Sequence, residues 1–218
     1  MHLWIVRHGE CLGQTDPNAF SDPDSDLSPL GEQQARLTAQ RLRNAGITHV
    51  LSSPLIRALA TASVIAEAIG GYPVEVWPEL REINNGVYRS ISHVELLQRF
   101  PCVLLSPSIA ADSREYGGDT YEGVFVRCEQ IQYRLKERFA ADAQVVAITH
   151  GGFANYFLHT LLHIAPTTPK WFEIANCAVS KVRFVPNPEQ ERPNWLLFPP
   201  VPIKILSVND TSHLLAMQ

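Results

Sequence analysis

The sequence predicts a three-layer α/β/α sandwich with a mostly parallel central sheet. Short apolar segments alternate along the chain with segments whose apolar residues recur at helical spacing, a pattern typical of parallel sheets covered by helices on both faces. Residues 3–6 and 145–148 are apolar, mostly β-branched runs of the kind found in strands buried on both faces. A histidine–glycine pair follows each run closely, at His8 and His150. Because ligands bind beyond the carboxyl ends of such strands, we expect both imidazoles at one crevice.

The first half of the chain alternates between strands and helices. In chain order, we expect a strand over residues 3–6, a helix from Ser28 to Gly46, a strand over 47–51, a helix from Ser53 to Gly70 and a strand over 74–77. Ser28 is a typical N-cap, with Pro29 at the first helical position. The second helix carries an apolar stripe, and Gly70 with Gly71 ends it. Residues 11–26 are rich in Asp, Pro, Ser and Gly, which indicates a loop.

The second half begins with a segment of weak periodicity. Between about residues 79 and 118 we expect one helix, near 93–100, within a cap-like excursion that partly covers the crevice. Asp119, with Glu122 three residues later, resembles a capping box and starts a helix that reaches Phe139. The remaining elements are a strand over 145–149, a helix over about 153–163 and strands over 177–185, 195–198 and 203–208. The apolar strands near the C-terminus make a homodimer one expectation.

The composition is that of a soluble protein with one domain. The chain has 218 residues, of which 45% are hydrophobic and 18% charged, enough for a single α/β domain over residues 1–218. A net charge of −4 argues against a nucleic-acid partner, because such proteins usually carry a basic excess. Without an apolar run of roughly 20 residues or a signal peptide, we expect a cytoplasmic protein that does not contact membranes. The four cysteines lack C-x-x-C spacing, so neither a disulfide framework nor a zinc site is indicated.

Charged and imidazole side chains at the ends of the predicted elements suit a phosphoryl site. Cleavage of a phosphate monoester needs fixed cationic and N–H donors, a nucleophile or activated water, and an acid for the leaving oxygen. Arg7 and His8 follow the first strand, and Arg57 lies in the first turn of a helix, where the macrodipole favours anions. His150 follows another strand and precedes glycines that let backbone approach a ligand closely, and Glu82 follows the third strand. Charge-assisted hydrogen bonds of about 1.5–3 kcal/mol each would hold the phosphate without a metal.

These residues lie in motifs that resemble those of the histidine phosphatase superfamily, also called the phosphoglycerate mutase-like family. The resemblance covers five ordered blocks: Arg7-His8-Gly9-Glu10, residues 27–35, residues 52–58, Leu80-Arg81-Glu82 and Thr149-His150-Gly151-Gly152. A lone Arg-His-Gly triplet occurs by chance, whereas five blocks in order are highly specific. The resemblance implies a phosphoglycerate mutase-like α/β/α fold and a phosphatase acting on a small phosphomonoester, with neither metal nor organic cofactor.

The resemblance also implies a role for each matching position. His8 is expected to attack phosphorus and become a phosphohistidine, while Glu82 protonates the leaving oxygen and then activates water. Arg7, Arg57 and His150 are expected to bind the phosphoryl oxygens. Physical chemistry agrees with this division, because neighbouring cations lower the pKa of a histidine that must be neutral to attack. A phosphate dianion, in turn, raises the pKa of a carboxyl group that must donate a proton.

The sequence departs from the family pattern at positions that shape the pocket. Gln14 stands where members often have Asn, and we expect its amide and Gly151 to contribute to substrate binding. Ala60 replaces a frequent Gln, and residues 83–90 lack the Trp-Glu pair found in many members. The reaction is therefore predicted, but the substrate is not. Four cations could contact a second anionic group of a substrate: Arg81, Arg89, Arg114 and Lys170.

Two other functions remain open. Phosphoglycerate mutases resemble the chain in the core blocks, although they typically carry longer, more basic substrate segments than this chain has. A non-catalytic module that senses a phosphorylated ligand would keep the fold, but it has no use for an acid such as Glu82.

Some residues also have alternative interpretations. Glu10 or Glu79 could serve as the acid in place of Glu82. His159 and His163 have the i, i+4 spacing of metal ligands, but they lie on an apolar helix with no Glu directly after His159, so we expect no metal. The aspartates within residues 16–26 are expected to form a solvated turn or to repel highly anionic substrates.

Overall fold

The computed structural model describes residues 1–15, 24–84, 86–89, 91–105, 115–165, 170–191 and 199–217. In chain order, its elements are β1 (His2–Arg7), α1 (Leu12–Thr15), α2 (Pro29–Leu42), β2 (His49–Ser52), α3 (Ile56–Ala68), β3 (Val74–Val76), the 3₁₀ helix η1 (Pro78–Leu80), β4 (Val87–Arg89), α4 (His93–Arg99), β5 (Val103–Leu105), β6 (Glu115–Gly117), α5 (Tyr121–Arg138), β7 (Gln144–Thr149), α6 (Gly151–Leu161), β8 (Val179–Phe184), α7 (Pro188–Glu191), β9 (Ile203–Asp210) and the 3₁₀ helix η2 (Ser212–Met217).

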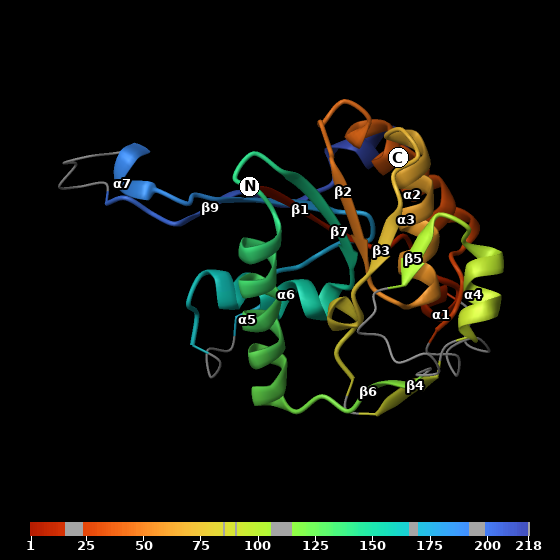
Figure 1. Ribbon diagram of the computed structural model, residues 1–218. Helices are drawn as coiled ribbons and strands as arrows, with labels where there is room; N and C mark the ends of the chain where they lie inside the picture. The colour runs from red at the N-terminus through yellow and green to blue at the C-terminus, as the bar shows by residue number, and fades with distance from the viewer. Residues whose placement is uncertain are drawn as a thin grey trace.

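A seven-stranded, mostly parallel sheet forms the centre of the molecule (Figure 1). Its strand order is β5-β3-β2-β7-β1-β8-β9. The strands from β5 to β1 are mutually parallel, whereas β8 and β9 pair antiparallel. In the register of β1 and β7, Arg7 stands beside Thr149, so two strands far apart in the sequence end together. His8 and His150 directly follow these two residues, at the same edge of the sheet.

Helices cover both faces of this sheet, which confirms the predicted three-layer α/β/α fold. Helices α5 and α6 lie on one face, and α2 and α3 lie on the other (Figure 1). Along β1 the side chains alternate between the two cores: Leu3 and Ile5 pack with α5 and α6, and Val6 packs with α2 and α3. All three are at most 3% exposed, so β1 is buried on both faces as predicted.

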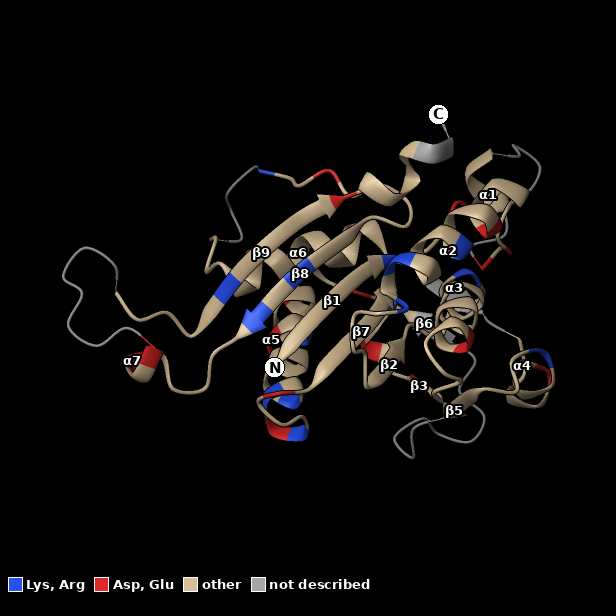
Figure 2. Cartoon of the chain, turned by 90° about the horizontal axis from the view of Figure 1, so that it is seen from above, with Lys and Arg blue, Asp and Glu red and all other residues tan. Residues whose placement is uncertain are grey.

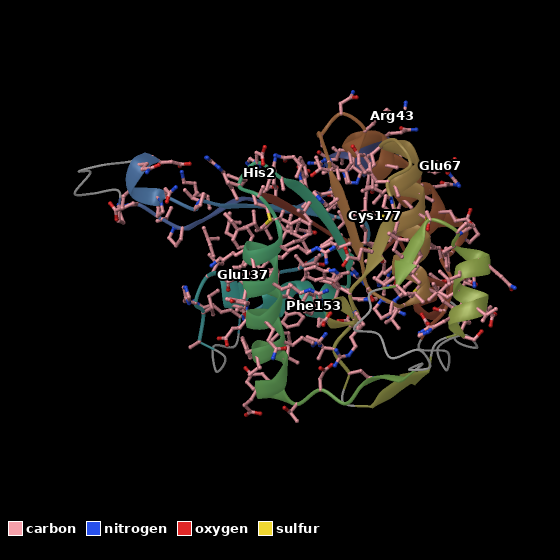
Figure 3. The ribbon with its side chains drawn as sticks, in the orientation of Figure 1. His2, Arg43, Glu67, Glu137, Phe153 and Cys177 are labelled. Carbon is pink, nitrogen blue, oxygen red and sulfur yellow. The ribbon has the colours of Figure 1, made fainter. Side chains whose placement is uncertain are left out.

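Charged side chains are kept away from the centre of the sheet. Figure 2 shows no charged residue on β7 and a basic residue only at the carboxyl end of β1. In Figure 3, Phe153 and Cys177 lie in the interior, while Arg43, Glu67 and Glu137 lie at the periphery. Arg7, the basic residue of β1, therefore lies at the carboxyl edge of the sheet.

The helix boundaries differ from the sequence prediction in several places. The short helix α1 lies within residues 11–26, which the sequence predicts to be a loop, and α3 begins at Ile56, with Leu55 as its N-cap, instead of at Ser53. The Ser28 side chain caps α2 by accepting from the Gly31 N–H at 3.0 Å. Helix α2 ends at Leu42, and Gly46, with φ of +71°, lies in the following turn. The prediction that Asp119 caps α5 is wrong, because Thr120 is the N-cap; Asp119 binds arginines instead. Helix α6 begins at Gly151, directly after His150 and two residues earlier than predicted.

The segment between residues 79 and 118 holds more regular structure than its periodicity indicates. Helix α4 lies where a helix is predicted, and β5 extends the edge of the main sheet beside β3. Strands β4 and β6 form a separate antiparallel pair, located below the main sheet in Figure 1. Strands of three residues are too short to show a periodic pattern, which explains why the sequence prediction lacks them. The predicted strand over 195–198 lies outside the described residues.

Helices of the described segments offer no stretch long and apolar enough to cross a membrane. All four cysteines are free.

Candidate active site

Three elements bring cationic and imidazole groups to the carboxyl edge of the sheet. Arg7 ends β1 and His8 follows it, while His150 is the N-cap residue of α6 directly after β7. Arg57 is the second residue of α3, which follows β2. The His8 and His150 rings have centroids 5.0 Å apart, and the Arg57 Nε lies 3.2 Å from the His8 Nε2. The structure thus brings together four of the site residues predicted from the sequence.

The hydrogen bonds of His8 fix its tautomer. Its Nδ1 lies 2.7 Å from the Gly9 carbonyl oxygen, which can only accept, so Nδ1 carries the proton. The Arg57 Nε–H donates to Nε2, which therefore holds its lone pair towards the site. The ring is only 4% exposed. Burial, followed by the charges of Arg57 and Arg7, holds the pKa of His8 well below its usual value, so the imidazole is neutral and its Nε2 is available as a nucleophile.

This environment predicts that His8 stays neutral in mildly acidic solution. A free imidazole with a pKa near 6.5 is mostly protonated at pH 5.5, whereas the buried His8 should keep the neutral tautomer with the proton on Nδ1. Nitrogen-15 NMR of histidine-labelled protein at pH 5.5 should report this tautomer, and the His8→Ala variant assigns the signal. A His8 titration midpoint at or above 6.5 would contradict the burial argument.

The same depressed pKa affects stability in a defined direction. Between the unfolded pKa near 6.5 and the lower folded pKa, the unfolded chain binds a proton that the folded His8 excludes. Its contribution to the free energy of unfolding therefore decreases as the pH falls through this range.

His150 is completely buried and lies opposite His8. Its Nε2 is 2.7 Å from the Ser53 hydroxyl oxygen, which also accepts from the Leu55 N–H at 3.3 Å. Ser53 can then direct its proton to Nε2, which leaves a proton on Nδ1. Nδ1 is buried without a hydrogen-bond partner among the described residues. Because buried imidazole nitrogens normally have partners, Nδ1 is suited to donate to a phosphoryl oxygen.

Each arginine is held in place by neighbouring groups of the protein. The Arg7 Nη1 donates to the Ile174 carbonyl at 2.6 Å, and its Nε lacks a partner among the described residues. Burial lowers the pKa of Arg7, an effect that the charge of Glu82 opposes. The Arg57 Nη1 lies 4.0 Å from the Asp24 carboxylate, whose Oδ1 accepts from the Ile56 N–H at 2.6 Å. Two guanidinium groups thus face one small volume.

Asp24 corrects one expectation. The sequence placed it in a solvated or substrate-repelling acidic loop, but it is 4% exposed and fixes the first turn of α3. Residues 16–23, including the other aspartates at the start of that loop, lie outside the described residues, while Asp26 pairs with Arg99.

Glu82 joins the site through the first turn of α6. Its Oε2 accepts from the Gly152 N–H at 3.2 Å, and its Oε1 accepts from the Phe153 N–H at 2.9 Å. A Cβ on Gly152 would lie 2.7 Å from the Glu82 Oε1, and one on Gly151 would lie 3.3 Å from the Arg7 Nε. Because Gly151 and Gly152 carry no side chains, Arg7 and Glu82 can pack directly against the start of α6.

The two alternative acids are placed elsewhere. Glu79 pairs with Arg134 on the outer part of α5 at 3.4 Å. Glu10 accepts from the Ser28 hydroxyl at 2.7 Å and thereby ties the loop after β1 to the start of α2. Of the three carboxylates considered, Glu82 is the one that lies against the α6 turn beside His150 and Arg7.

The loop over residues 174–177, which precedes β8, holds the backbone of the candidate nucleophile. The Asn176 Nδ2 donates to the His8 carbonyl at 3.1 Å and lies 3.2 Å from the Gln14 Oε1. The Cys177 N–H donates to the Arg7 carbonyl at 3.0 Å. Gln14 is thus tied to Asn176, and its predicted contact with substrate remains a prediction. Asn176, Ser53 and Asp24 were not identified as site residues from the sequence, although Ser53 lies within one of the family motifs.

Removal of the Asn176 amide should weaken the site without unfolding the protein. One hydrogen bond contributes about 1 kcal/mol, so Asn176→Ala should lower kcat/KM about fivefold for any phosphoester that is turned over, with little change in melting temperature. Asn44→Ala, at an exposed position between α2 and β2, is the matched control. Equal activity of the two variants would show that the contact with His8 does not position it.

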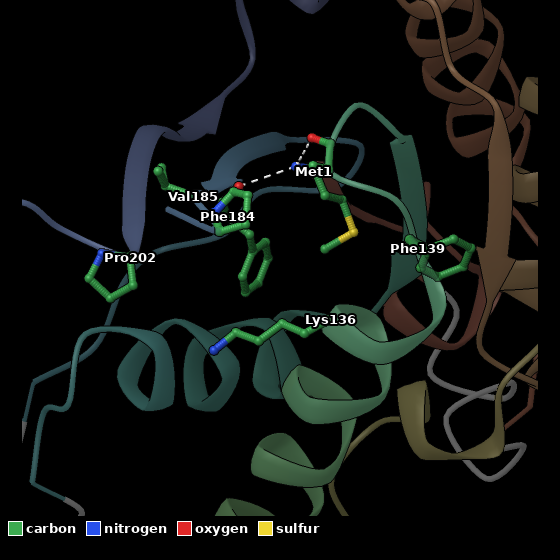
Figure 4. A pocket seen from close by; sticks show the side chains of 8 residues that line it. Met1, Lys136, Phe139, Phe184, Val185 and Pro202 are labelled. Atoms are coloured by element: carbon green, nitrogen blue, oxygen red, sulfur yellow. Dashed lines mark hydrogen bonds between the residues drawn. The ribbon is translucent and has the colours of Figure 1, made fainter. Parts of the chain in front are cut away.

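A pocket at the opposite edge of the sheet has none of this chemistry. It encloses about 370 Å³ and is lined mainly by apolar side chains, with Lys136 beside Met1, Phe139 and Phe184 (Figure 4). The Met1 amine donates to the Phe184 carbonyl at 3.2 Å. None of the described residues that line the pocket carries an imidazole, carboxylate or thiol, and β1 separates the pocket from His8 by roughly 20 Å.

A metal site is not formed by the described residues. They contain no group of three or more His, Cys, Asp or Glu side chains that could hold a metal ion. His159, considered above for its spacing to His163, packs its ring against Phe172 with centroids 5.6 Å apart.

The chain matches a family profile and is similar in sequence to a known protein. The profile of the histidine phosphatase superfamily (branch 1) matches residues 3–192. A probable phosphoglycerate mutase, GpmB, of Yersinia enterocolitica is 32% identical over 223 residues, covering 98% of this chain and 95% of the relative.

Solved structures add a likeness in fold. A phosphoserine phosphatase of Entamoeba histolytica, in complex with phosphoserine, superposes with a TM-score of 0.66 at 23% identity, covering 98% of this chain and 99% of that one. A mycobacterial glucosyl-3-phosphoglycerate phosphatase gives a TM-score of 0.58 at 23% identity, covering 83% and 92%. Because the profile spans most of the chain and the Yersinia relative is matched nearly end to end, the chain belongs to the histidine phosphatase superfamily.

Proposed function

We propose that this protein is a phosphatase that hydrolyses a small phosphomonoester through a phosphohistidine on the His8 Nε2, without a metal ion. The observation that carries the proposal is the forced tautomer of His8, with the proton on Nδ1 and the Nε2 lone pair beside two guanidinium groups and the second imidazole. A module that only binds phosphate needs cations and donors, but it gains nothing from a buried neutral imidazole held in this way.

Phosphate binding requires a rearrangement of one hydrogen bond. The Arg57 Nε–H now donates to the His8 Nε2, so it must turn to a phosphoryl oxygen before that nitrogen can attack. Arg7 and the His150 Nδ1 would donate to the remaining oxygens. These donors are already in place, and a preorganised site stabilises developing charge without further reorganisation.

The reaction then proceeds in two displacements. The Nε2 lone pair forms a bond to phosphorus as the bond from phosphorus to the leaving oxygen breaks, and Glu82 transfers its proton to that oxygen. Water next attacks phosphorus and gives a proton to Glu82, and the electron pair of the P–N bond returns to Nε2. Inorganic phosphate and the regenerated acid complete the cycle.

The test is release of inorganic phosphate from a panel of phosphomonoesters, with and without EDTA. We expect turnover of at least one ester and little effect of the chelator. Absence of release from every ester would favour the binding module, and strong EDTA inhibition would exclude the metal-free mechanism.

Phosphoglycerate mutase activity is the second candidate, favoured by the 32% identity to a probable phosphoglycerate mutase. Its chemistry shares the phosphohistidine but returns the phosphoryl group to an organic acceptor instead of water. Interconversion of 3- and 2-phosphoglycerate faster than phosphate release would establish the mutase.

A further inference from the structure

Four aromatic rings form a continuous surface near the candidate active site. Tyr121 and Phe125 on α5, Tyr156 on α6 and Trp171 on the following segment, here called the aromatic wall, have consecutive ring centroids 5.2–6.0 Å apart. Trp171 is 61% exposed and Tyr121 is 46% exposed. Clustered exposed aromatic area of this kind is typical of a binding surface.

The aromatic wall is joined to the site by α6. Tyr156 follows Gly152 by four residues and therefore lies on the same face of the helix, about 6 Å along its axis. The Gly152 N–H donates to the Glu82 carboxylate. Because Glu82 is the group proposed to protonate the leaving oxygen, the aromatic wall stands on the side of the site from which the leaving group extends.

The position of Trp171 is set by paired hydrogen bonds to α6. The Asn155 Nδ2 donates to the Phe172 carbonyl, and the Phe172 N–H donates to the Asn155 Oδ1, both at 2.6 Å. The backbone beside Trp171 is therefore anchored one residue before Tyr156, and the two rings meet edge to face. An anchored aromatic surface loses little entropy when a ligand binds to it.

Two arginines that meet at Asp119, directly before α5, are already engaged by its carboxylate. The terminal nitrogens of Arg81 and Arg127 bind the two oxygens of Asp119 at 2.9 and 3.0 Å, and Arg127 also donates to the Glu79 and Arg81 carbonyls. Only the buried Nε atoms of the two arginines lack a partner among the described residues. Arg81, considered from the sequence for a second anionic group, therefore has both terminal nitrogens engaged within the protein.

Resting on the proposed phosphatase function, we infer that the aromatic wall is the leaving-group subsite. It selects phosphomonoesters whose leaving group is planar or largely apolar. Stacking on Trp171 and Tyr156 contributes to substrate binding, while the phosphoryl site performs the same chemistry on every ester.

Trp171→Ala tests the inference, with Trp171→Phe as the conservative variant and Tyr133→Ala, an exposed tyrosine of α5 outside the aromatic wall, as the matched control. Aromatic contacts of this size correspond to an effect of about threefold to tenfold. Trp171→Ala should lower kcat/KM for 2-naphthyl phosphate by this factor, mainly through KM, and change that for glycerol 2-phosphate less than twofold. Trp171→Phe should restore most of the loss. Equal losses on both esters would overturn the inference.

A binding measurement separates this inference from the proposed function. By calorimetry, wild-type protein should bind 2-naphthylmethylphosphonate more tightly than methylphosphonate, and Trp171→Ala should remove most of the difference. That result stands even if no ester is hydrolysed, in which case the phosphatase proposal fails alone. Equal affinity of wild type for the two phosphonates, or a preference for 3-phosphoglycerate over 2-naphthyl phosphate, would overturn the subsite.

Discussion

Replacing His8 with alanine should reduce phosphate release by a factor of about a thousand or more while the fold is retained. Loss of a nucleophile that forms a covalent intermediate removes the main reaction path, and effects of this size or larger are known for such residues. The remaining cations, Arg7 and Arg57, would still bind phosphate. The measurement is kcat for the best ester of the panel, with circular dichroism as the check on folding.

His163→Asn is the matched control for this prediction. His163 is exposed, lies after α6 with φ of +52°, and asparagine tolerates that conformation. This variant should keep wild-type activity.

In wild type, acid-labile and alkali-stable label from a radioactive phosphoester should appear on residue 8 during turnover. Product formation without label at that position would remove the phosphohistidine mechanism.

Glu82→Gln should give the second largest effect, a loss of about a hundredfold to ten thousandfold in kcat/KM for alkyl phosphates. Glutamine keeps one of the two oxygens that accept from the Gly152 and Phe153 N–H groups, so the start of α6 stays partly capped, but the amide does not transfer a proton. Esters with good leaving groups need less help from an acid. The loss measured with 4-nitrophenyl phosphate should therefore be clearly smaller.

Glu79→Gln provides the control for the acid. The Glu79–Arg134 pair is partly exposed, and such pairs contribute about 0–1 kcal/mol to stability, so kcat/KM should change less than twofold. If Glu82→Gln instead lowered kcat/KM equally for alkyl and 4-nitrophenyl esters, Glu82 would act by positioning Arg7 and α6 and not as the acid.

The strands that carry the candidate active site could be predicted because each depends on the local pattern of apolar residues. A run such as residues 3–6 that is apolar at every position must be buried on both faces, and the structure places Leu3 and Val6 in opposite cores. The residue that follows such a strand is then at the sheet edge. His8 and His150 were predicted to meet for this reason, and their rings are 5.0 Å apart.

The supporting contacts could not be predicted, because they join segments that are far apart in the chain. Asn176 binds the His8 carbonyl across 168 residues, and Asp24 reaches the α3 backbone from a loop whose composition indicates a solvated turn. Long-range contacts also explain why Thr120, and not Asp119, is the N-cap of α5. Local spacing favours Asp119, but two arginines brought close by the fold occupy its carboxylate.

The sequence by itself determined the α/β/α architecture, the order of its main elements and the candidate site residues, because hydrophobic periodicity and motif order are properties of the chain. Only the tertiary structure decided which carboxylate lies against the first turn of α6, which nitrogen of His8 carries the proton and which aromatic rings cluster between α5 and α6. Hydrogen-bond direction and burial depend on neighbours that the folded backbone supplies, and no spacing along the chain encodes them.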